Sequence, residues 1–573
     1  MLLTAILIAV PLIVTAKTNV VLILSDDLRA QLNVEGFSSG PNVPNLRYLS
    51  WTGHTFNHAY ANQALCGPSR NSFLSGRRPQ HTAAYNFVDS FRDVGQNWTT
   101  LPGLFKSNNY TTVGAGKVRG SEERSDEPPV TTAIILIPHS NPFRDSLRSL
   151  QIFHPGLPPD NDIPYSWDDR MSDGTWEDWM YPTEDACSGG TAWCGTTNET
   201  DLEDYKTTQQ SLKLLDNVTK EEENPFFLAV GYRKPHLQWR VPQRVLDGVR
   251  LGDVTSPSQT SFPPSTPPLA YHMPVDDFLL EFSDVEACGS GNLTDPSEPW
   301  FSDECARLWR RGYYAAVEYM DEQVGIILDE LRERGLEDNT IVAFFGDHGW
   351  HLGEWGMWEK FSNFEVALRT PMFIRAPGMG YGLVDTPVEL VDVYKTLAEL
   401  AGLELPSGET IDGDSMVHLM EGGGGEGDDM AFSQFPRCLN GENYANLPLS
   451  KDDRNVWEVY NEGDAPSHRH EISDLPEWKL TNCNEITVDG MDWMGLSVRT
   501  VDWRFTQWFK FGADGIDWES GTKGREELYR YFKGDVDVFD GVHNFENVVS
   551  DPAYVEVVEE LRGYIKRQWG NDK

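Results

Sequence analysis

Cys66 begins a segment whose residue types and spacing could perform nucleophilic chemistry. Pro68 suits a first helical turn and Gly76 is placed to end it, so the sequence predicts a short helix with Cys66 just ahead of it. Free backbone N–H groups and the helix dipole favour developing negative charge at that point, where a nucleophile could attack an anionic ester. A lone cysteine in a secreted chain is more often structural or disulfide-bonded. The residues around Cys66 favour a nucleophile over a structural cysteine. They are Gly67-Pro68-Ser69-Arg70 and Phe73-Leu74-Ser75-Gly76-Arg77-Arg78-Pro79.

Carboxylates and a histidine follow two runs of aliphatic and aromatic residues. Residues 19–24 lead into Asp26 and Asp27, and residues 341–345 lead into Asp347 and His348. Neither run alternates with polar residues, which is typical of strands buried on both faces of a mainly parallel sheet. Ligands bind at the carboxyl ends of such strands, and oxygen-rich donors favour Ca²⁺ or Mg²⁺ over zinc. Asp after a strand is also common in turns and helix caps, but the second cluster favours a metal site.

The elements that must position these residues are an α/β domain and a smaller C-terminal domain. Residues 308–334 carry an apolar stripe that ends before Gly335, which predicts a helix, and residues 388–400 predict another. Helices that alternate with buried strands predict a mostly parallel sheet in an α/β domain over residues 17–420. A Gly-rich linker follows at 421–430, and residues 431–573 predict a smaller α+β domain. Its antiparallel sheet is indicated by the aromatic, alternating segments 496–508 and 527–532.

Composition excludes some functions. The chain has 573 residues, is 39% hydrophobic and has a formal net charge of −42, so it is globular and strongly acidic. Nucleic acid is not expected as a partner, because phosphate binding needs a basic face. An anionic substrate would need a local basic pocket within this acidic surface.

The N-terminus and the cysteines indicate a secretory route. Residues 1–16 form an apolar run that ends Val14-Thr15-Ala16, which predicts a cleaved signal peptide, with an uncleaved anchor as the alternative. No later stretch predicts a membrane span. Besides Cys66 there are six cysteines, for which fifteen pairings exist. Cys187 and Cys194, and Cys288 and Cys305, are near enough in sequence to pair, which leaves Cys438 and Cys483 for the C-terminal region. The chain is therefore expected to be secreted or lysosomal/vacuolar. The five Asn-x-Ser/Thr sites agree with that route: Asn97, Asn109, Asn198, Asn217 and Asn292.

The Cys-x-Pro-Ser-Arg segment with the following Leu-Ser-Gly-Arg-Arg-Pro resembles the signature of the type I sulfatases. In that family the cysteine is converted to formylglycine by a formylglycine-generating enzyme. A hydrated aldehyde offers two hydroxyls, one to attack sulfur and one to expel sulfate as the carbonyl re-forms. The resemblance implies an alkaline-phosphatase-like sulfatase fold. It also implies one divalent cation, held by Asp26, Asp27, Cys66, Asp347 and His348.

Further motifs are similar to the iduronate-2-sulfatase branch of the family. The resemblance implies that Arg70 orients the formylglycine diol. It implies that His236 acts as the acid and His154 as the base. The residues expected around the sulfate are Lys117, His154, Lys234, His236 and Lys360. The matching motifs include Gly116-Lys117-Val118, Phe153-His154-Pro155-Gly156, Lys234-Pro235-His236, Asp347-His348-Gly349-Trp350 and Ser433-Gln434-Phe435-Pro436-Arg437.

Residues 119–152 depart from this resemblance. In relatives the lysine of Gly-Lys-Val is followed almost at once by Phe-His-Pro-Gly, whereas here a charged, Ser/Pro-rich insert intervenes. A surface loop is one interpretation, because loop closure costs grow slowly with length. A translated intron is the other, and we favour it because the insert separates Lys117 from His154.

The sequence thus predicts a sulfatase that removes O-sulfate from a carbohydrate, such as a sulfated uronate-containing polysaccharide or glycosaminoglycan. One alternative is a phosphate or phosphonate ester hydrolase on the same scaffold. The other is a non-catalytic, glycan-binding descendant.

Overall fold

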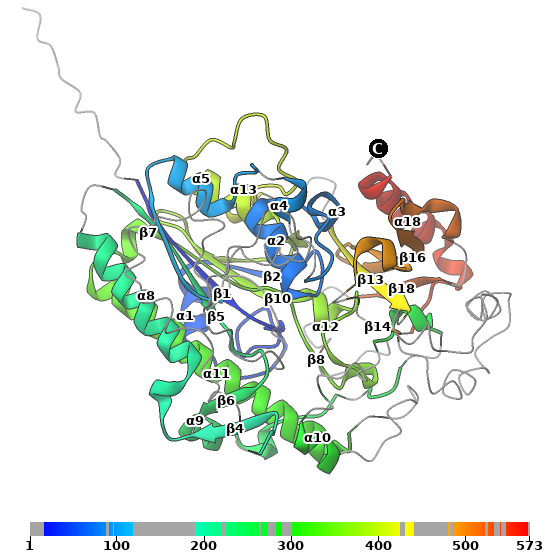
Figure 1. Cartoon of the computed structure of the whole chain (residues 1–573), viewed down its shortest axis with the longest axis horizontal. Helices are drawn as coiled ribbons and strands as arrows, with labels where there is room; N and C mark the ends of the chain where they lie inside the picture. The colour runs from blue at the N-terminus through cyan, green and yellow to red at the C-terminus, as the bar shows by residue number, and fades with distance from the viewer. Residues whose placement is uncertain are drawn as a thin grey trace, which may run out of the picture.

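An eight-stranded mixed sheet forms the centre of the larger domain in the computed structural model (Figure 1). The structure describes residues 17–117 and 187–570, apart from short gaps and the longer ones at 273–278, 289–298, 424–429, 440–479, 532–538 and 540–545. The strand order is β11-β2-β10-β7-β1-β5-β3, with β12 beside β2, and only β10 runs antiparallel to its neighbours. The strands are β1 (Asn19–Ser25), β2 (His54–Tyr60), β3 (Thr111–Gly116), β5 (Phe226–Tyr232), β7 (Thr340–Gly346), β10 (Arg369–Arg375), β11 (Gly382–Val384) and β12 (Val388–Glu389). The predicted mostly parallel sheet is confirmed.

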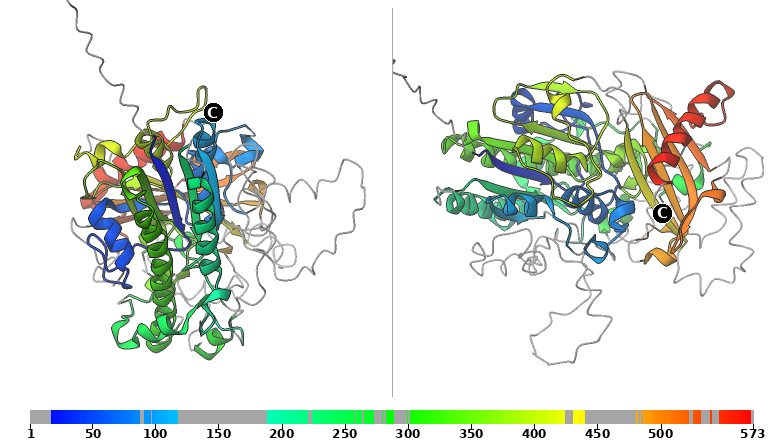
Figure 2. Two further views of the ribbon diagram at one scale, coloured as in Figure 1. Left: turned by 90° about the vertical axis from the view of Figure 1, so that its left-hand side faces the viewer. Right: turned by 90° about the horizontal axis from the view of Figure 1, so that it is seen from above.

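The sheet is buried on both faces because the middle positions of its central strands are all apolar, as at residues 20–24 of β1 and 341–345 of β7. In β1, Val21 and Ile23 join one core, and Val20, Leu22 and Leu24 join the other. The first core is covered by α1 (Pro44–Thr52), α8 (Glu203–Lys220) and α11 (Asp303–Glu333). The second is covered by α2 (Cys66–Ser75), α5 (Leu101–Ser107) and α13 (Asp392–Leu400), so the sheet lies between two helical layers (Figure 2).

Two helices differ in length from the sequence prediction. The helix predicted at 308–334 begins earlier, as α11, because Ser302 caps it by accepting a hydrogen bond from the Cys305 N–H. The helix predicted at 388–400 begins later, as α13, because Val388 and Glu389 form β12 against β2.

Smaller elements connect the layers. Short helices are α3 (Pro79–Thr82), α4 (Phe91–Val94), α9 (Gln243–Gly248), α10 (Ser283–Cys288), α12 (Glu365–Leu368) and α14 (Val417–Met420). Two two-stranded sheets are formed by β4 (Trp193–Thr196) with β6 (Trp239–Pro242), and by β8 (His351–Leu352) with β9 (Trp358–Glu359). The three disulfides expected from the sequence are present: Cys187–Cys194, Cys288–Cys305 and Cys438–Cys483. Among the described helices, none is long and apolar enough to cross a bilayer.

The C-terminal domain is an antiparallel sheet packed against α18 (Val555–Trp569), as the view from above shows (Figure 2). Its predicted antiparallel strands are confirmed. They are β13 (Ala431–Leu439), β14 (Leu480–Thr481), β15 (Trp493–Arg499), β16 (Trp503–Gly512), β17 (Gly515–Asp517) and β18 (Glu526–Arg530).

A buried ionic cluster joins the two domains. Glu365 of α12 accepts hydrogen bonds from Arg504 at 2.8 Å, Arg499 at 3.2 Å and the Tyr60 hydroxyl at 2.7 Å. All three charged side chains are at most 3% exposed. Burial would raise the pKa of Glu365, but the two arginines outweigh it and hold that pKa well below its usual range. The contribution of this carboxylate to stability is therefore complete above the pKa of an unfolded glutamate, about 4.3, and is lost as the pH falls through the lower folded-state pKa.

We predict that Glu365→Gln will lower the free energy of unfolding by about 3–5 kcal/mol, because both arginines stay buried without a counter-charge. Urea denaturation followed by tryptophan fluorescence at pH 7 measures the change. Asp253→Asn, which removes an exposed pair with Arg250, is the control and should leave the unfolding midpoint in place. A Glu365→Gln protein as stable as the unmodified chain would contradict this account of the domain interface.

Candidate active site

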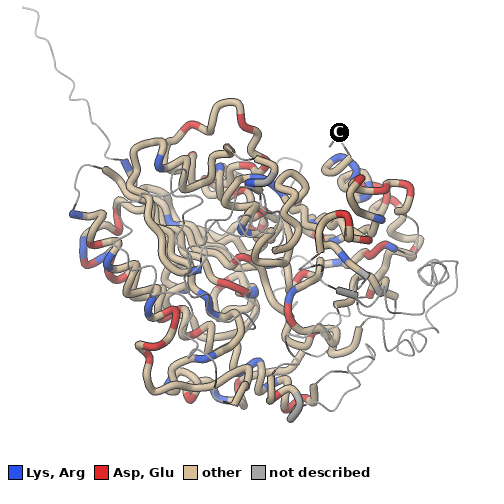
Figure 3. The backbone as a smooth tube through the Cα atoms, in the orientation of Figure 1, with Lys and Arg blue, Asp and Glu red and all other residues tan. Residues whose placement is uncertain are grey.

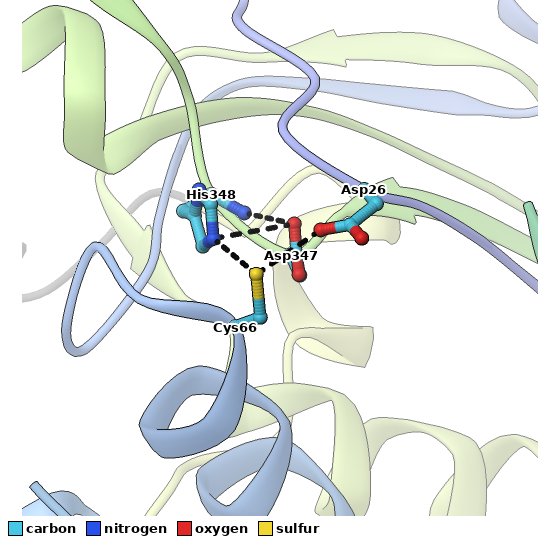
Figure 4. A group of neighbouring side chains, drawn as sticks. All are labelled: Asp26, Cys66, Asp347 and His348. Carbon is cyan, nitrogen blue, oxygen red and sulfur yellow. Dashed lines mark hydrogen bonds and ion pairs between the residues drawn. The ribbon is translucent and has the colours of Figure 1, made fainter. Parts of the chain in front are cut away.

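Four side chains from three parts of the chain converge at the carboxyl edge of the sheet (Figure 4). Asp26 follows β1, and Asp347 and His348 follow β7, which pairs in parallel with β1 so that Ser25 lies opposite Gly346. Cys66 approaches from α2. Its thiol lies 3.2 Å from Asp26 Oδ1 and 3.3 Å from His348 Nε2, and all four residues are fully buried.

Cys66 is the first residue of α2, not the residue ahead of it, because Leu65 occupies the N-cap position in an extended conformation. The helix ends at Gly76 as predicted, with a φ of 69° that suits glycine. Burial raises the pKa of the Cys66 thiol well above its usual value, and the nearby Asp26 raises it further. The thiol is therefore neutral in this site.

Three cations compensate the carboxylates at this edge. Arg70, one turn after Cys66 in α2, donates to Asp347 Oδ2 at 2.9 Å, and Lys117 pairs with Asp26 Oδ2. Lys360 Nζ lies 2.8 Å from Asp27 Oδ1 and 3.1 Å from the Cys66 sulfur. Each of the three side chains is at most 4% exposed. Burial alone would raise the pKa of Asp26, but Lys117, His236 and Arg70 together hold it well below its usual value.

The donor set fits a hard divalent cation. Asp27 Oδ2 is buried and has no hydrogen-bond donor among the described residues, although a carboxylate oxygen of this kind normally has one. His348 Nδ1 faces the Gly349 carbonyl at 3.0 Å, which assigns the proton to Nδ1 and leaves Nε2 free to bind a metal. Burial lowers the pKa of His348, so its imidazole is neutral. Asp26, Asp27, Asp347 and His348 could therefore hold Ca²⁺ or Mg²⁺ together with the side chain at position 66.

Lys234 and His236 lie on one loop after β5, at the same edge of the sheet. His236 Nε2 lies 4.0 Å from Asp27 Oδ2, while its Nδ1–H donates to the Leu237 carbonyl. The Lys234 ammonium donates to the Gln238 carbonyl at 2.7 Å. His154 and the insert at 119–152 lie outside the described residues.

Two residues that support the site were not identified from the sequence. Asp204, fully buried in the first turn of α8, accepts the backbone N–H groups of Arg233 and Lys234 at 2.8 and 3.0 Å. It looks in the sequence like an ordinary acidic residue at a helix start. Tyr313, within α11, donates to the Asp27 carbonyl at 2.7 Å and has the spacing of a core aromatic.

The comparisons with known proteins agree with this site. The family model described as Sulfatase matches residues 18–403, most of the chain. Iduronate 2-sulfatase of Mus musculus is 31% identical over 535 residues, which cover 87% of this chain and 86% of that protein. Among solved structures, the phosphonate monoester hydrolase of Agrobacterium radiobacter has a TM-score of 0.62 at 18% identity and covers 96% of both chains. A 2-O GAG sulfatase has a TM-score of 0.55 at 17% identity and covers 96% of this chain and 92% of its own.

The two structural likenesses concern the fold alone, whereas the family match and the 31% identity concern descent. The family match covers residues 18–403, which include Cys66, the strand-end carboxylates and the basic residues around them. The chain therefore belongs to the sulfatase family and is a sulfuric ester hydrolase.

Proposed function

We propose that this sulfatase removes an O-sulfate from a uronate-containing carbohydrate, and that Cys66 acts as formylglycine. The observation that carries the proposal is the position of Cys66 at the start of α2, beside Asp26 and His348 and in contact with Lys360. The similarity to iduronate 2-sulfatase supports the substrate class. Formylglycine at position 66 would supply a hydrated aldehyde, and a bound Ca²⁺ or Mg²⁺ would supply positive charge that favours its ionised form.

The protein's own residues bind the sulfate and move the proton. Sulfuryl transfer spreads negative charge over equatorial oxygens, which preorganised cations stabilise. Lys117 and Lys360 are buried next to the nucleophile and suit this role. Arg70 is fixed by Asp347, so it orients the side chain at position 66. His236 Nε2 faces Asp27 and can hold the proton that the leaving alcohol takes up, whereas His154 stays a prediction as the base.

Charge balance in the site agrees with a dication and a monoanionic ester. The three aspartates and the three cations cancel: Asp26, Asp27 and Asp347 against Arg70, Lys117 and Lys360. A lone sulfate ester would then add uncompensated negative charge to a buried site, and a lone dication would add uncompensated positive charge. Metal and substrate together leave a small residual charge, which lowers the cost of burying both.

We also propose a secretory route that ends outside the cell or in a lysosome-like compartment. Three disulfides support it, since such bonds persist in oxidising compartments. The described asparagines of the glycosylation motifs, Asn97, Asn109, Asn198 and Asn217, are all exposed, as attachment of a glycan requires. The predicted signal peptide lies outside the described residues.

For the metal, we predict that chelation will lower the thermal midpoint and that added Ca²⁺ or Mg²⁺ will restore it. A ligand at 100 times its Kd stabilises the folded state by about 2.7 kcal/mol. Calorimetry with EDTA and with each ion measures the shift, and elemental analysis counts the bound metal. Asp27→Asn should lose the response, and Asp253→Asn should keep it. If the unmodified protein binds neither ion and its midpoint does not move, the metal site is wrong.

For the reaction, we predict release of sulfate from 2-O-sulfated iduronate saccharides, and faster turnover of sulfate esters than of phosphate or phosphonate esters. Ion chromatography measures the released anion. Peptide mass spectrometry on active enzyme should show formylglycine at position 66, and Cys66→Ala should abolish turnover while the protein stays folded. Faster phosphonate turnover would favour the alternative hydrolase. Full activity with intact cysteine would refute the nucleophile, and an unmodified, inactive protein would favour the glycan-binding descendant.

For the insert, we propose that residues 119–152 are a translated intron. Lys117 lies in the site beside Asp26, and the resemblance implies that His154 acts at the same sulfate, so the insert separates two residues that the site needs together. A chain that joins Val118 directly to Phe153 should express better than the full-length protein and be at least as active. Comparing purified yields and kcat/KM on one sulfate ester tests this. An inactive deletion beside an active full-length chain would show that the insert is a functional loop.

A further inference from the structure

Lys360 depends on a short, unusual piece of backbone. It directly follows β9, and its ammonium reaches Asp27 Oδ1 and the Cys66 sulfur while it lies 5.4 Å from the Trp350 ring centroid. A lysine side chain is flexible, so this reach requires a fixed backbone. The preceding residue, Glu359, has a φ of 68°, a left-handed conformation that a non-glycine residue keeps only where its surroundings impose it.

A buried histidine contacts the side chain of Glu359. His272 Nε2 lies 3.1 Å from Glu359 Oε2, and the two side chains are 1% and 3% exposed. A carboxylate only accepts hydrogen bonds, so the His272 proton is on Nε2. Burial, Arg437 and His351 lower the pKa of His272, which keeps it a neutral donor.

The C-terminal domain in turn holds His272. Arg437 of β13 donates to the carbonyls of Leu269 and Ala270, at 2.9 and 3.4 Å, just before His272 in the chain. Phe435, from the same strand, packs against Phe361 with ring centroids 6.3 Å apart.

The segment after Lys360 is held by the same domain. The Phe361 ring lies 4.7 Å from the His272 ring, and Asn363 donates to the Gly495 carbonyl of β15 at 3.0 Å. Side chains after Lys360 therefore contact the C-terminal sheet directly, and Glu359 before it is connected to that sheet through His272.

From these contacts we propose that His272 is a positioning residue, through which the C-terminal domain sets the location of the Lys360 ammonium by way of Glu359. The inference rests on the proposed function, which gives Lys360 its role at the sulfate. It assigns the C-terminal sheet a part in the reaction beyond covering the larger domain.

The test compares two substitutions at His272 with a matched control. His272→Leu removes the donor, and His272→Gln keeps an N–H near the position of Nε2. His54→Leu removes another buried histidine, 5% exposed at the start of β2, and controls for the loss of an imidazole from the interior. We expect kcat/KM on a sulfate ester to fall about 10- to 100-fold for His272→Leu, because a shift of about 1 Å in a catalytic group has that effect. The other two variants should stay within about threefold of the unmodified enzyme.

A double-mutant cycle separates positioning from general destabilisation. In a Lys360→Ala background, His272→Leu should cause less than a twofold further loss, because its effect passes through the missing ammonium. A full, additive loss in that background would overturn the proposal.

Crystal structures decide the question independently of catalysis. In His272→Leu, Lys360 Nζ should leave Asp27 and position 66, and in His272→Gln it should stay. An undisplaced Lys360 in His272→Leu would overturn the proposal even if activity fell. If the unmodified protein hydrolyses no sulfate ester, the proposed function fails, while the positions of Lys360 in the two structures still decide the role of His272.

Discussion

The constraint on which this structure depends is the burial of three carboxylates at one edge of a sheet. Asp26, Asp27 and Asp347 are fully buried around Cys66 and His348, with Asp26 3.2 Å from the Cys66 sulfur and Asp27 and Asp347 3.5 and 3.7 Å from His348 Nε2. Such an arrangement would be very costly without opposite charges. The compensating cations come from distant parts of the chain: Arg70 from α2, Lys117 from the end of β3, and Lys360 from the residue after β9. The strand order that brings β1, β7 and β3 into one sheet therefore also assembles the site.

The domain interface follows the same rule. Glu365 is buried beside Arg499 and Arg504, so a carboxylate of one domain is neutralised by arginines of the other. This cluster lies five residues after Lys360, and Asn363 between them contacts β15. Separation of the domains would thus expose an unpaired charge on each side and release the segment that carries Lys360. The two domains act as one structural unit around the site.

The sequence predicted those features that depend on local pattern. Apolar strands without alternation identified β1 and β7, and the polar residues directly after them identified the edge where Asp26 and His348 meet. The spacing of Pro68 and Gly76 identified α2, although the helix includes Cys66 because an extended Leu65 serves as its cap. The motif similarities named Lys117 and Lys360, which no periodicity distinguishes from surface lysines.

What the sequence could not predict depends on contacts between distant residues. The antiparallel insertion of β10 between β2 and β7 leaves no local signal, and neither does the left-handed Glu359. Asp204 resembles any acidic residue at a helix start until its carboxylate is found under the Lys234 loop. The sequence also does not show that His272 lies next to Glu359, because the two residues are far apart in the chain and meet only in the folded protein.

The local arrangement of charge also resolves the apparent conflict between a net charge of −42 and an anionic substrate. Lys and Arg are interspersed with Asp and Glu along the helices (Figure 3), and salt screens exposed charges of this kind beyond about 8 Å. The cations next to Cys66 are buried, where screening is weak and each charge acts strongly at short range. A sulfate ester bound at the proposed site would therefore be attracted mainly by the few cationic groups that it contacts. The net charge of −42 describes the whole chain, whereas the charge that an ester would meet at the proposed site would be set by the cations beside Cys66 and by a bound dication, so the two need not have the same sign.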